Sequence, residues 1–412
     1  MAANLAQGNS RARGWMMACA LLLALSVTAC ALPFSATADT EPAFAARLRP
    51  ALAAQMKSLG VPGAIVYVEY PGHGTWTATM GTSDVSTNAP MRLDAHMRVG
   101  SITKTFTGTV ILQLAEEGQL GLDDPVAQYQ PEVPNGKHIT IRELLNMTSG
   151  LFNYSEDAGF DNLLMAQPSR VWQPKELLAI AFQHPPYFAP GQDFHYSNTN
   201  TILLGLIVEQ ITGKTLAEEF QQRIFTPLGM NSTSFPAPAL AALPNPHPQG
   251  YASQASGECP AKPAASGEQG AKIKNQPALL CDVTDFNPSW GWAAGAAIST
   301  LHDLRIWAKA LATGKLLNED MQKERLTWSP IEQNASYGLA IFDVSGFLGH
   351  NGSLPGFQSF MGYRPDKGAT VIVLTNLDQS AYCAPPASPG GTPTCTEPAD
   401  ALSKVIIKQV FS

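Results

Sequence analysis

The sequence predicts an α/β protein of the α+β type, in which helices from both chain ends flank an antiparallel β-sheet and a mostly helical second subdomain lies beside it. Helical periodicity occurs at residues 41–59 and 399–411. β-Branched strand patterns follow the first of these helices and precede the last, and the signals between them are helices and loops. The 412 residues are 45% hydrophobic, which is enough for a substantial core.

The N-terminus has the layout of an export signal. Arg11 and Arg13 precede an apolar run from Trp15 to Leu25, and small residues follow it. The run is too short to span a bilayer as a permanent helix. We therefore expect a periplasmic or secreted protein.

Two cleavage sites compete at the end of this signal. Cleavage after Ala36-Thr37-Ala38 would remove a signal peptide of residues 1–38. Alternatively, Val27-Thr28-Ala29-Cys30 resembles a lipoprotein box, which would remove residues 1–29 and anchor the protein to a membrane through an acylated Cys30. In either case we expect residues 39–412 to form a single catalytic domain, with the helical subdomain at about residues 120–290.

Cysteine usage agrees with export to an oxidising compartment. Four cysteines remain beyond the signal, and proximity in the sequence predicts the disulfides Cys259–Cys281 and Cys383–Cys395, although four cysteines allow three pairings. Their spacing does not resemble a zinc site, and the eight histidines show no H-E-x-x-H pattern, so we expect no metal and no cofactor. The net charge of -7 and the absence of a Lys/Arg-rich run argue against a nucleic-acid partner.

The first part of the mature chain reads as a helix followed by a hairpin. The helix at 41–59 should end at Gly60, with Pro62 beyond it. Strand patterns at 63–70 and 75–80 are separated by the turn sequence Pro-Gly-His-Gly. An antiparallel sheet therefore starts early in the chain.

A second helix should begin at or just before Ser101 and end near Gly118. It is apolar on nearly all sides and rich in threonine, a poor helix former, so we expect it to be buried between layers of structure. Residues three apart share a helix face, so the Lys104 side chain should rise beside the Ser101 hydroxyl. This is the layout of a serine nucleophile with its own base, because a desolvated lysine can accept the hydroxyl proton.

The middle of the chain carries helical patterns at 141–147, 173–181 and 199–211. Residues 236–289 are rich in Pro, Ala, Gly and Ser, which indicates a long surface excursion stapled by its disulfide. Strand patterns then return, and the final helix follows. The three strands are expected at 337–344, 356–364 and 369–375.

Three short motifs occur once each and in a fixed order: Ser101-Ile102-Thr103-Lys104, Tyr196-Ser197-Asn198 and His350-Asn351-Gly352. This combination resembles the serine penicillin-recognising enzymes, in the branch that holds class C β-lactamases, soluble DD-peptidases and related esterases. The flanking text VGSITKTFTGTVILQLAEEGQLGLDDPV and APGQDFHYSNTNTILLGLIVEQITGKTL is also similar to that branch. The resemblance covers roughly residues 41–411 and implies a β-lactamase/DD-peptidase-like fold.

The resemblance implies a role for each motif residue. Ser101 would attack an amide or ester carbonyl, and Lys104 would hold or take its proton. Tyr196 would exchange protons with Ser101 and with the leaving amine if the Lys104 charge lowers its pKa. Asn198 would contact Lys104 and a substrate amide, although an asparagine there could equally cap the helix that follows.

The third motif would serve the oxyanion and the substrate. The backbone N–H groups of Ser101 and Ser353 would hold the oxyanion, and Gly352 would allow close approach of the substrate. His350 stands where β-lactamases of this branch usually have lysine and some DD-peptidases have histidine, so its attraction for a carboxylate depends on protonation. Asn351 replaces a frequent threonine, which puts carboxylate recognition in doubt and keeps esterase chemistry open.

Two aromatic residues are further candidates for substrate contact. Tyr154 and Trp290 could line the acyl side of the cleft or could simply pack in the core. The expected function is an exported serine hydrolase that forms an acyl-enzyme on D-Ala-D-Ala-type peptides. A class C-like β-lactamase, or an esterase or D-amino-acid peptidase, is the alternative, so the expected partners are small peptide, β-lactam or ester substrates.

Overall fold

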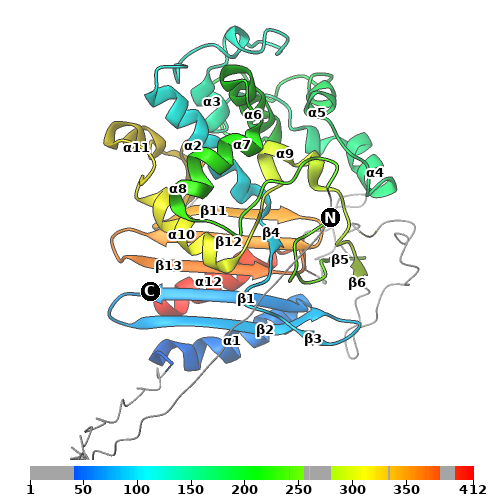
Figure 1. The fold of residues 1–412 in the computed structure, drawn as a ribbon, viewed down its shortest axis with the longest axis vertical. Coiled ribbons are helices and arrows are strands. Elements are labelled where there is room, and N and C mark those ends of the chain that lie inside the picture. The colour runs from blue at the N-terminus through cyan, green and yellow to red at the C-terminus, as the bar shows by residue number, and fades with distance from the viewer. Residues whose placement is uncertain (1–40, 241, 255–258, 260–279, 333–334, 381–394) are drawn as a thin grey trace, which may run out of the picture. The chain divides into compact units, whose positions relative to one another are not determined.

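A computed structural model describes residues 41–240, 242–254, 259, 280–332, 335–380 and 395–412. The predicted signal, Cys30 and Cys383 lie outside these residues. Within them, nine strands form one antiparallel sheet in the order β3-β2-β1-β13-β12-β11-β10-β9-β8 (Figure 1). The strands are β1 (Gly63–Tyr70), β2 (Gly74–Asp84), β3 (Ala89–Pro90), β8 (Ser329–Glu332), β9 (Ala335–Tyr337), β10 (Phe342–Val344), β11 (Phe347–Leu354), β12 (Phe357–Arg364) and β13 (Ala369–Thr375).

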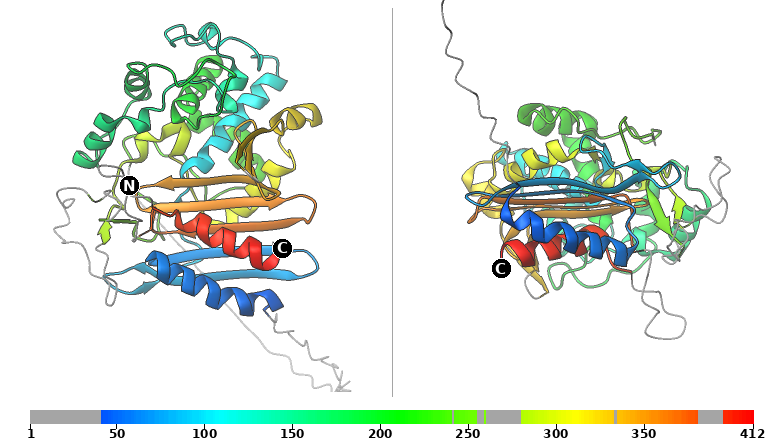
Figure 2. Two further views of the ribbon diagram at one scale, coloured as in Figure 1. Left: turned by 180° about the vertical axis from the view of Figure 1, so that it is seen from behind. Right: turned by 90° about the horizontal axis from the view of Figure 1, so that it is seen from below.

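The two terminal helices cover one face of this sheet, as predicted (Figure 2). They are α1 (Ala43–Leu59), which ends at Gly60 in a left-handed conformation, and α12 (Pro398–Val410). Successive side chains of a strand point to opposite faces. Val66 of β1 therefore packs in the core under α1 and α12, whereas its neighbour Ile65 packs in the larger core on the other side.

The larger core joins the opposite sheet face to the helical part of the chain. The 14-residue helix α2 (Thr103–Glu116) lies at its centre and is buried along most of its length, as predicted. Its threonine hydroxyls have partners: Thr105 accepts a hydrogen bond from the Trp307 indole at 2.8 Å, and Thr107 donates one to the Ala293 carbonyl at 2.7 Å. Hydrogen bonds of this kind allow the polar side chains of a helix to be buried.

The remaining helices surround α2 or line the sheet. They are α3 (Ile141–Leu145), α4 (Ala158–Ala166), α5 (Pro174–Ala181), α6 (Asn198–Thr212), α7 (Leu216–Phe220), α8 (Thr226–Leu228), α9 (Trp292–Gly295), α10 (Leu301–Ala312) and α11 (Glu319–Arg325). Two small strand pairs complete the structure: β4 (Met97–Arg98) with β7 (Ile298–Ser299), and β5 (Tyr251–Ser253) with β6 (Leu280–Asp282). The predicted helices at 141–147, 173–181 and 199–211 are α3, α5 and α6.

The prediction of one strand at 337–344 was wrong. The chain forms the separate strands β9 and β10, which pair antiparallel. Between them Ala340 has a positive φ of 56°, and its N–H donates to the Leu145 carbonyl at 3.0 Å. This tertiary hydrogen bond holds a turn that the β-type pattern of the sequence did not indicate.

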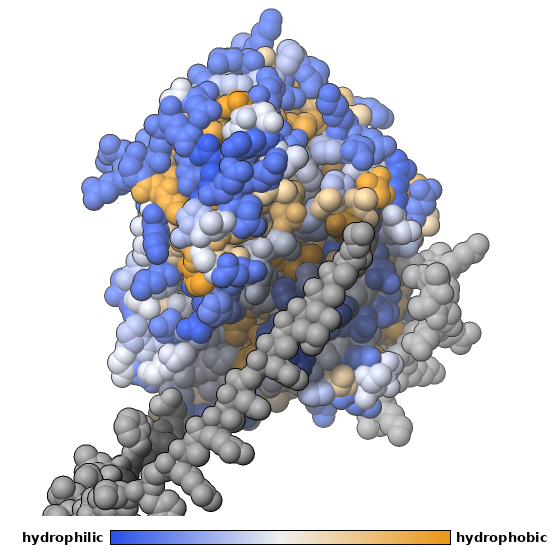
Figure 3. All heavy atoms as spheres, in the orientation of Figure 1, coloured by the Kyte–Doolittle hydropathy of each residue, from blue (hydrophilic) through white to orange (hydrophobic). Residues whose placement is uncertain are grey.

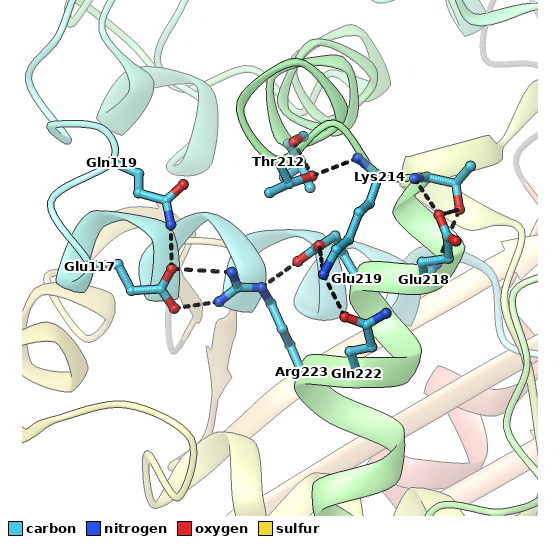
Figure 4. A network of polar contacts seen from close by, with 10 residues as sticks. Glu117, Gln119, Thr212, Lys214, Glu218, Glu219, Gln222 and Arg223 are labelled. Carbon is cyan, nitrogen blue, oxygen red and sulfur yellow. Dashed lines mark hydrogen bonds and ion pairs between the residues drawn. The ribbon is translucent and has the colours of Figure 1, made fainter.

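A network of charged side chains fastens α7 to the end of α2 (Figure 4). Arg223 donates to both Glu117, at 2.5 Å, and the buried Glu219, which is 1% exposed. The Lys214 ammonium lies 3.7 Å from the same Glu219 carboxylate. The pairing removes the cost of an isolated buried charge.

The predicted disulfide Cys259–Cys281 is present. Cys395 is also disulfide-bonded, but its predicted partner Cys383 lies outside the described residues. The face in Figure 3 is largely hydrophilic, with apolar side chains in small groups. In the described part of the chain, no helix has both the length and the apolar character needed to cross a membrane.

Candidate active site

Ser101 and Lys104 lie together at the junction of the sheet and the helical part. Ser101 is in a 3₁₀ turn (Gly100–Ile102) that leads directly into α2, whose second residue is Lys104. The Lys104 Nζ lies 3.0 Å from Ser101 Oγ, within hydrogen-bond distance, as the three-residue spacing predicts. Lys104 is 0% exposed, and burial holds its pKa well below the usual value. A neutral amine beside the hydroxyl can accept its proton.

Asn198 is the second strong contact of the Lys104 amine. Its Oδ1 accepts from Lys104 Nζ at 2.6 Å, and the Ala294 carbonyl accepts from the same nitrogen at 3.0 Å. The capping alternative for Asn198 was wrong, because Ser197 occupies the N-cap position and Asn198 is the first residue of α6. The Asn198 side chain therefore points into the site instead of closing the helix end.

Two residues that sequence reasoning missed orient Asn198. Its Nδ2 donates to Ser155 Oγ at 2.9 Å, and Ser155 donates in turn to Asn153 Oδ1 at 3.0 Å. The same Asn153 oxygen accepts from the Asn198 backbone N–H at 3.1 Å. These contacts fix which end of the Asn198 amide faces Lys104. The Asn-x-Ser turn is too common in sequences to have been a signal.

Tyr196 joins the nucleophile from the loop that enters α6. It shares a hydrogen bond with Ser101, and Lys104 Nζ lies 4.8 Å from the centre of its ring. The expectation that Lys104 lowers the pKa of Tyr196 was wrong. Burial raises that pKa above the ordinary value for tyrosine, and the nearby Glu397 charge raises it further. The phenol is therefore protonated at neutral pH.

The pKa values of Lys104 and Tyr196 shift in opposite directions, and these shifts assign the two residues different roles in proton transfer. Burial disfavours the charged form of each group, so it lowers the pKa of the lysine toward the neutral amine and raises the pKa of the tyrosine, which keeps the phenol neutral. The amine can then serve as the proton acceptor and the phenol as the proton donor.

The backbone of β11 runs against the start of α2, where an oxyanion would be held. A Cβ on Gly352 would lie 2.0 Å from the Val99 carbonyl oxygen and 2.7 Å from the Ser101 backbone nitrogen. A Cβ on Gly100, whose φ is +53°, would lie 2.5 Å from the Ser353 backbone nitrogen. Only glycine at these two positions lets the two backbone segments approach closely enough to bring the N–H groups of Ser101 and Ser353 together. Such a pair of donors suits a developing oxyanion.

His350 lies on β11 and is 1% exposed. Its Nδ1 lies 2.6 Å from the Asn351 carbonyl oxygen, and its Nε2 lies 2.9 Å from the Tyr337 hydroxyl. A carbonyl oxygen can only accept, so Nδ1 carries the proton and Nε2 accepts from Tyr337. Burial lowers the pKa of His350 to about 3. His350 is thus a neutral imidazole, and not the cation that would attract a carboxylate.

Asn351 faces helix α12. Its Nδ2 donates to Asp400 Oδ2 at 2.8 Å and lies 3.4 Å from Glu397 Oε2. Glu397 also accepts from Gln358 at 2.9 Å. The amide hydrogens that would take the place of a threonine hydroxyl are therefore directed to carboxylates of the protein itself. The sequence pattern contained no signal for this pairing.

The two aromatic candidates lie behind the site. Tyr154 is 0% exposed, and its hydroxyl donates to the Trp290 carbonyl at 2.5 Å. Phe160 packs edge-on against both rings. Trp290 itself is partly exposed. The structure thus places Tyr154 in the core, and a direct substrate contact by either residue stays a prediction.

Among the residues that the structure describes, no group of three or more His, Cys, Asp or Glu side chains could hold a metal ion.

Comparison with known proteins identifies a family model and solved structures that resemble this chain. A family model described as Beta-lactamase matches residues 48–387. A solved D-stereospecific amidohydrolase from Streptomyces sp. is 34% identical, with a TM-score of 0.67 over 79% of this chain and 94% of that protein. D-amino acid amidase from Ochrobactrum anthropi SV3 is 26% identical, with a TM-score of 0.68 over 81% of this chain and 91% of that protein.

The curated relatives are longer proteins. Protein flp of Staphylococcus aureus is 27% identical over 329 residues, which is 77% of this chain and 60% of that protein. The chain therefore spans less than two thirds of the length of these relatives.

Proposed function

The chain belongs to the beta-lactamase family of serine hydrolases, and we propose that it hydrolyses the amide bond that follows a D-configured residue, as in D-Ala-D-Ala-type peptides. The observation that carries this proposal is the connected set of Ser101, Lys104, Asn198 and Tyr196. A buried amine whose pKa is lowered lies within hydrogen-bond distance of the serine, and a protonated phenol shares a hydrogen bond with the same serine.

The reaction follows from these positions. Lys104 Nζ takes the Ser101 proton while Oγ forms a bond to the substrate carbonyl carbon, and the N–H groups of Ser101 and Ser353 stabilise the oxyanion. The C–N bond then breaks, and Tyr196 gives its proton to the leaving amine and regains one from the Lys104 ammonium. In the second half, a water molecule forms a bond to the ester carbonyl carbon and gives a proton to Lys104. The bond from that carbon to Ser101 Oγ then breaks, Oγ takes the proton from Lys104, and the acyl group leaves as a carboxylic acid.

A second candidate is the hydrolysis of simple D-amino acid amides. It is favoured by the neutral state of His350, because a substrate without a terminal carboxylate needs no cation there. It is also favoured by the likeness to a D-stereospecific amidohydrolase and a D-amino acid amidase. Turnover of β-lactams or of esters would use the same serine and is distinguished by experiment.

The test uses the mature protein and a Ser101→Ala control with four compounds: a D-Ala-D-Ala dipeptide, D-phenylalanine amide with its L-isomer, a labelled penicillin, and a short acyl ester. We expect amide cleavage that is specific for the D-isomer and a stable penicillin label on Ser101. Rapid penicillin hydrolysis would favour the β-lactamase alternative, and ester turnover alone would favour the esterase. Activity that survives in Ser101→Ala would contradict the whole proposal.

We also propose that the protein is exported. The disulfide Cys259–Cys281 supports this, since such bonds form in oxidising compartments. Mass spectrometry of the mature N-terminus from a cell-envelope fraction tests the proposal. A chain that begins at Asp39 indicates an ordinary signal peptidase, an acylated Cys30 indicates a lipoprotein, and an intact Met1 in the cytoplasm would contradict export.

A further inference from the structure

A cavity of about 670 Å³ opens beside the catalytic tyrosine and reaches helix α12. Tyr196, His350 and Asn351 line its inner end. The proton donor of the acylation step must lie next to the leaving nitrogen. Tyr196 is that donor in the proposed reaction, so this cavity lies on the leaving-group side of the scissile bond.

The size and walls of the cavity indicate a leaving group larger than ammonia. A water molecule takes about 30 Å³ in the liquid, so the cavity could hold the side chain and terminal group of an amino acid residue. Much of the wall is apolar and comes from the edge strands, the loop before α6 and helix α12: Phe194, Ile331, Phe342, Val344, Phe360 and Ile407.

The polar end of the cavity is acidic where it meets the catalytic residues. Asp400 lines the cavity and accepts from Asn351, and its second oxygen Oδ1 is buried with no hydrogen-bond partner among the described residues. Burial, and after it the charge of the neighbouring Glu397, raises the pKa of Asp400. The Glu397 charge also reaches Tyr196, whose pKa it raises.

Among the residues that the structure describes, none at this end of the cavity offers a free carboxylate a cation or a free side-chain N–H donor. His350 is neutral, and the Asn351 amide already donates to Asp400 and Glu397. The cations that line the cavity are Lys404 and Lys408, both of which are exposed and lie one and two helical turns beyond Asp400. A carboxylate beside Asn351 would therefore meet like charge, whereas an N–H donor would meet acceptors.

We propose that Asp400 is a specificity-determining residue that selects leaving groups with an apolar body and a terminal N–H donor, either a primary amide or an ammonium, over leaving groups with a free carboxylate. The inference rests on the proposed function and narrows its substrate class. Within that class, the enzyme should cleave D-configured peptides with a blocked or basic end faster than peptides that end in a free carboxylate.

The test compares three substrates with one acyl part. N-acetyl-D-Ala-D-Phe is prepared with a free carboxylate, with a primary amide, and with the carboxylate reduced to an aminomethyl group. For the wild-type protein we expect kcat/KM to be at least about tenfold higher for the amide and the aminomethyl compound than for the carboxylate. A wild-type preference for the carboxylate would overturn the inference.

Two variants assign the preference to the acidic pair. In Asp400→Asn we expect the carboxylate substrate to gain about tenfold and the aminomethyl substrate to lose a similar factor. Glu397→Gln, at an exposed position, should change the ratio in the same direction. Asp320→Asn on α11, far along the chain and exposed, is the matched control and should leave the ratio unchanged. An unchanged ratio in both acidic-pair variants would contradict the role of Asp400.

A separate readout keeps the two proposals distinguishable. Labelling of Ser101 by a fluorophosphonate shows that the active site is intact in each variant. If one of the variants Asp400→Asn and Glu397→Gln does not label, only the other is used for the comparison. If no peptide is cleaved, the proposed function fails, and protection of Ser101 from the label then decides the inference. Stronger protection by the amide peptide than by the acid peptide supports it, and equal or weaker protection overturns it.

Discussion

Replacement of Asn198 should shift the pH dependence of kcat/KM. The direction of the shift depends on which residue replaces it. The Asn198 oxygen lies 2.6 Å from Lys104 Nζ and stabilises the ammonium more than the neutral amine. In the proposed reaction the neutral amine is the base, so kcat/KM rises with pH through the pKa of Lys104. Asn198→Asp brings a carboxylate to the same place and should raise that pKa.

The size of the shift follows from the distance. Two unit charges at 2.6 Å attract by about 6 kcal/mol at an effective dielectric constant of about 20. Desolvation of the new carboxylate offsets part of this, which leaves a movement of about one to three pH units to higher pH. At pH values below both the old and the new pKa, activity should fall by about tenfold for each unit of the shift, and it should recover in alkaline buffer. Asn198→Ala removes one charge-assisted hydrogen bond, worth about 1.5–3 kcal/mol, and should move the acid limb by about one to two pH units to lower pH.

The assay is kcat/KM for a D-aminoacyl p-nitroanilide from about pH 4 to about pH 10, which reports groups of the free enzyme. Asn231→Asp, at an exposed position outside the site, is the control for added charge. An acid limb that stays in place in Asn198→Asp, or that moves to lower pH, would refute Lys104 as the titrating base.

Three further changes test other parts of the structure. Gly352→Ala should lower kcat by about 100-fold or more, because its Cβ would collide with the backbone at the nucleophile and displace an oxyanion donor; steady-state kinetics measures this. Arg223→Ala leaves the buried Glu219 with only a more distant lysine and should lower the free energy of unfolding by about 3 kcal/mol in urea denaturation. Replacement of both Cys259 and Cys281 by serine should cost about 3 kcal/mol of stability, because the bond closes a loop of 22 residues.

Each of these has a matched comparison. Gly118→Ala also places a side chain at a positive φ, but nothing lies within 4 Å of its Cβ, so it should reduce stability by about 1 kcal/mol and leave kcat intact. Glu117→Gln removes the exposed partner of the ion-pair network and should cost less than about 1 kcal/mol. Equal effects in a variant and its comparison would contradict the reasoning in each case. For the disulfide, the comparison is the wild-type protein after reduction. If its free energy of unfolding is unchanged by reduction, the predicted contribution of the disulfide to stability is wrong.

Local patterns were enough to predict most of the fold. The terminal helices, the first hairpin and the strands β12 and β13 are where periodicity placed them, because each buries a face that its own sequence defines. Two regions differ: no strand was predicted for β11, which carries His350, and residues 337–344 form two strands and not one. The turn at Ala340 depends on a hydrogen bond to Leu145 from a distant segment, and no local pattern contains that contact.

The sequence by itself determined the nucleophile and its base, because Ser101 and Lys104 are three residues apart on one helical segment and their proximity needs no other part of the chain. Only the tertiary structure decided how the site is charged. The partners that enclose Lys104 come from 94 and 190 residues away, and burial among them sets its pKa. The acidic partner of Asn351 likewise comes from α12, 49 residues later. Protonation states depend on the sum of surroundings in space, and for this reason the motif predicted the chemistry of the serine but not the substrate charge that the site accepts.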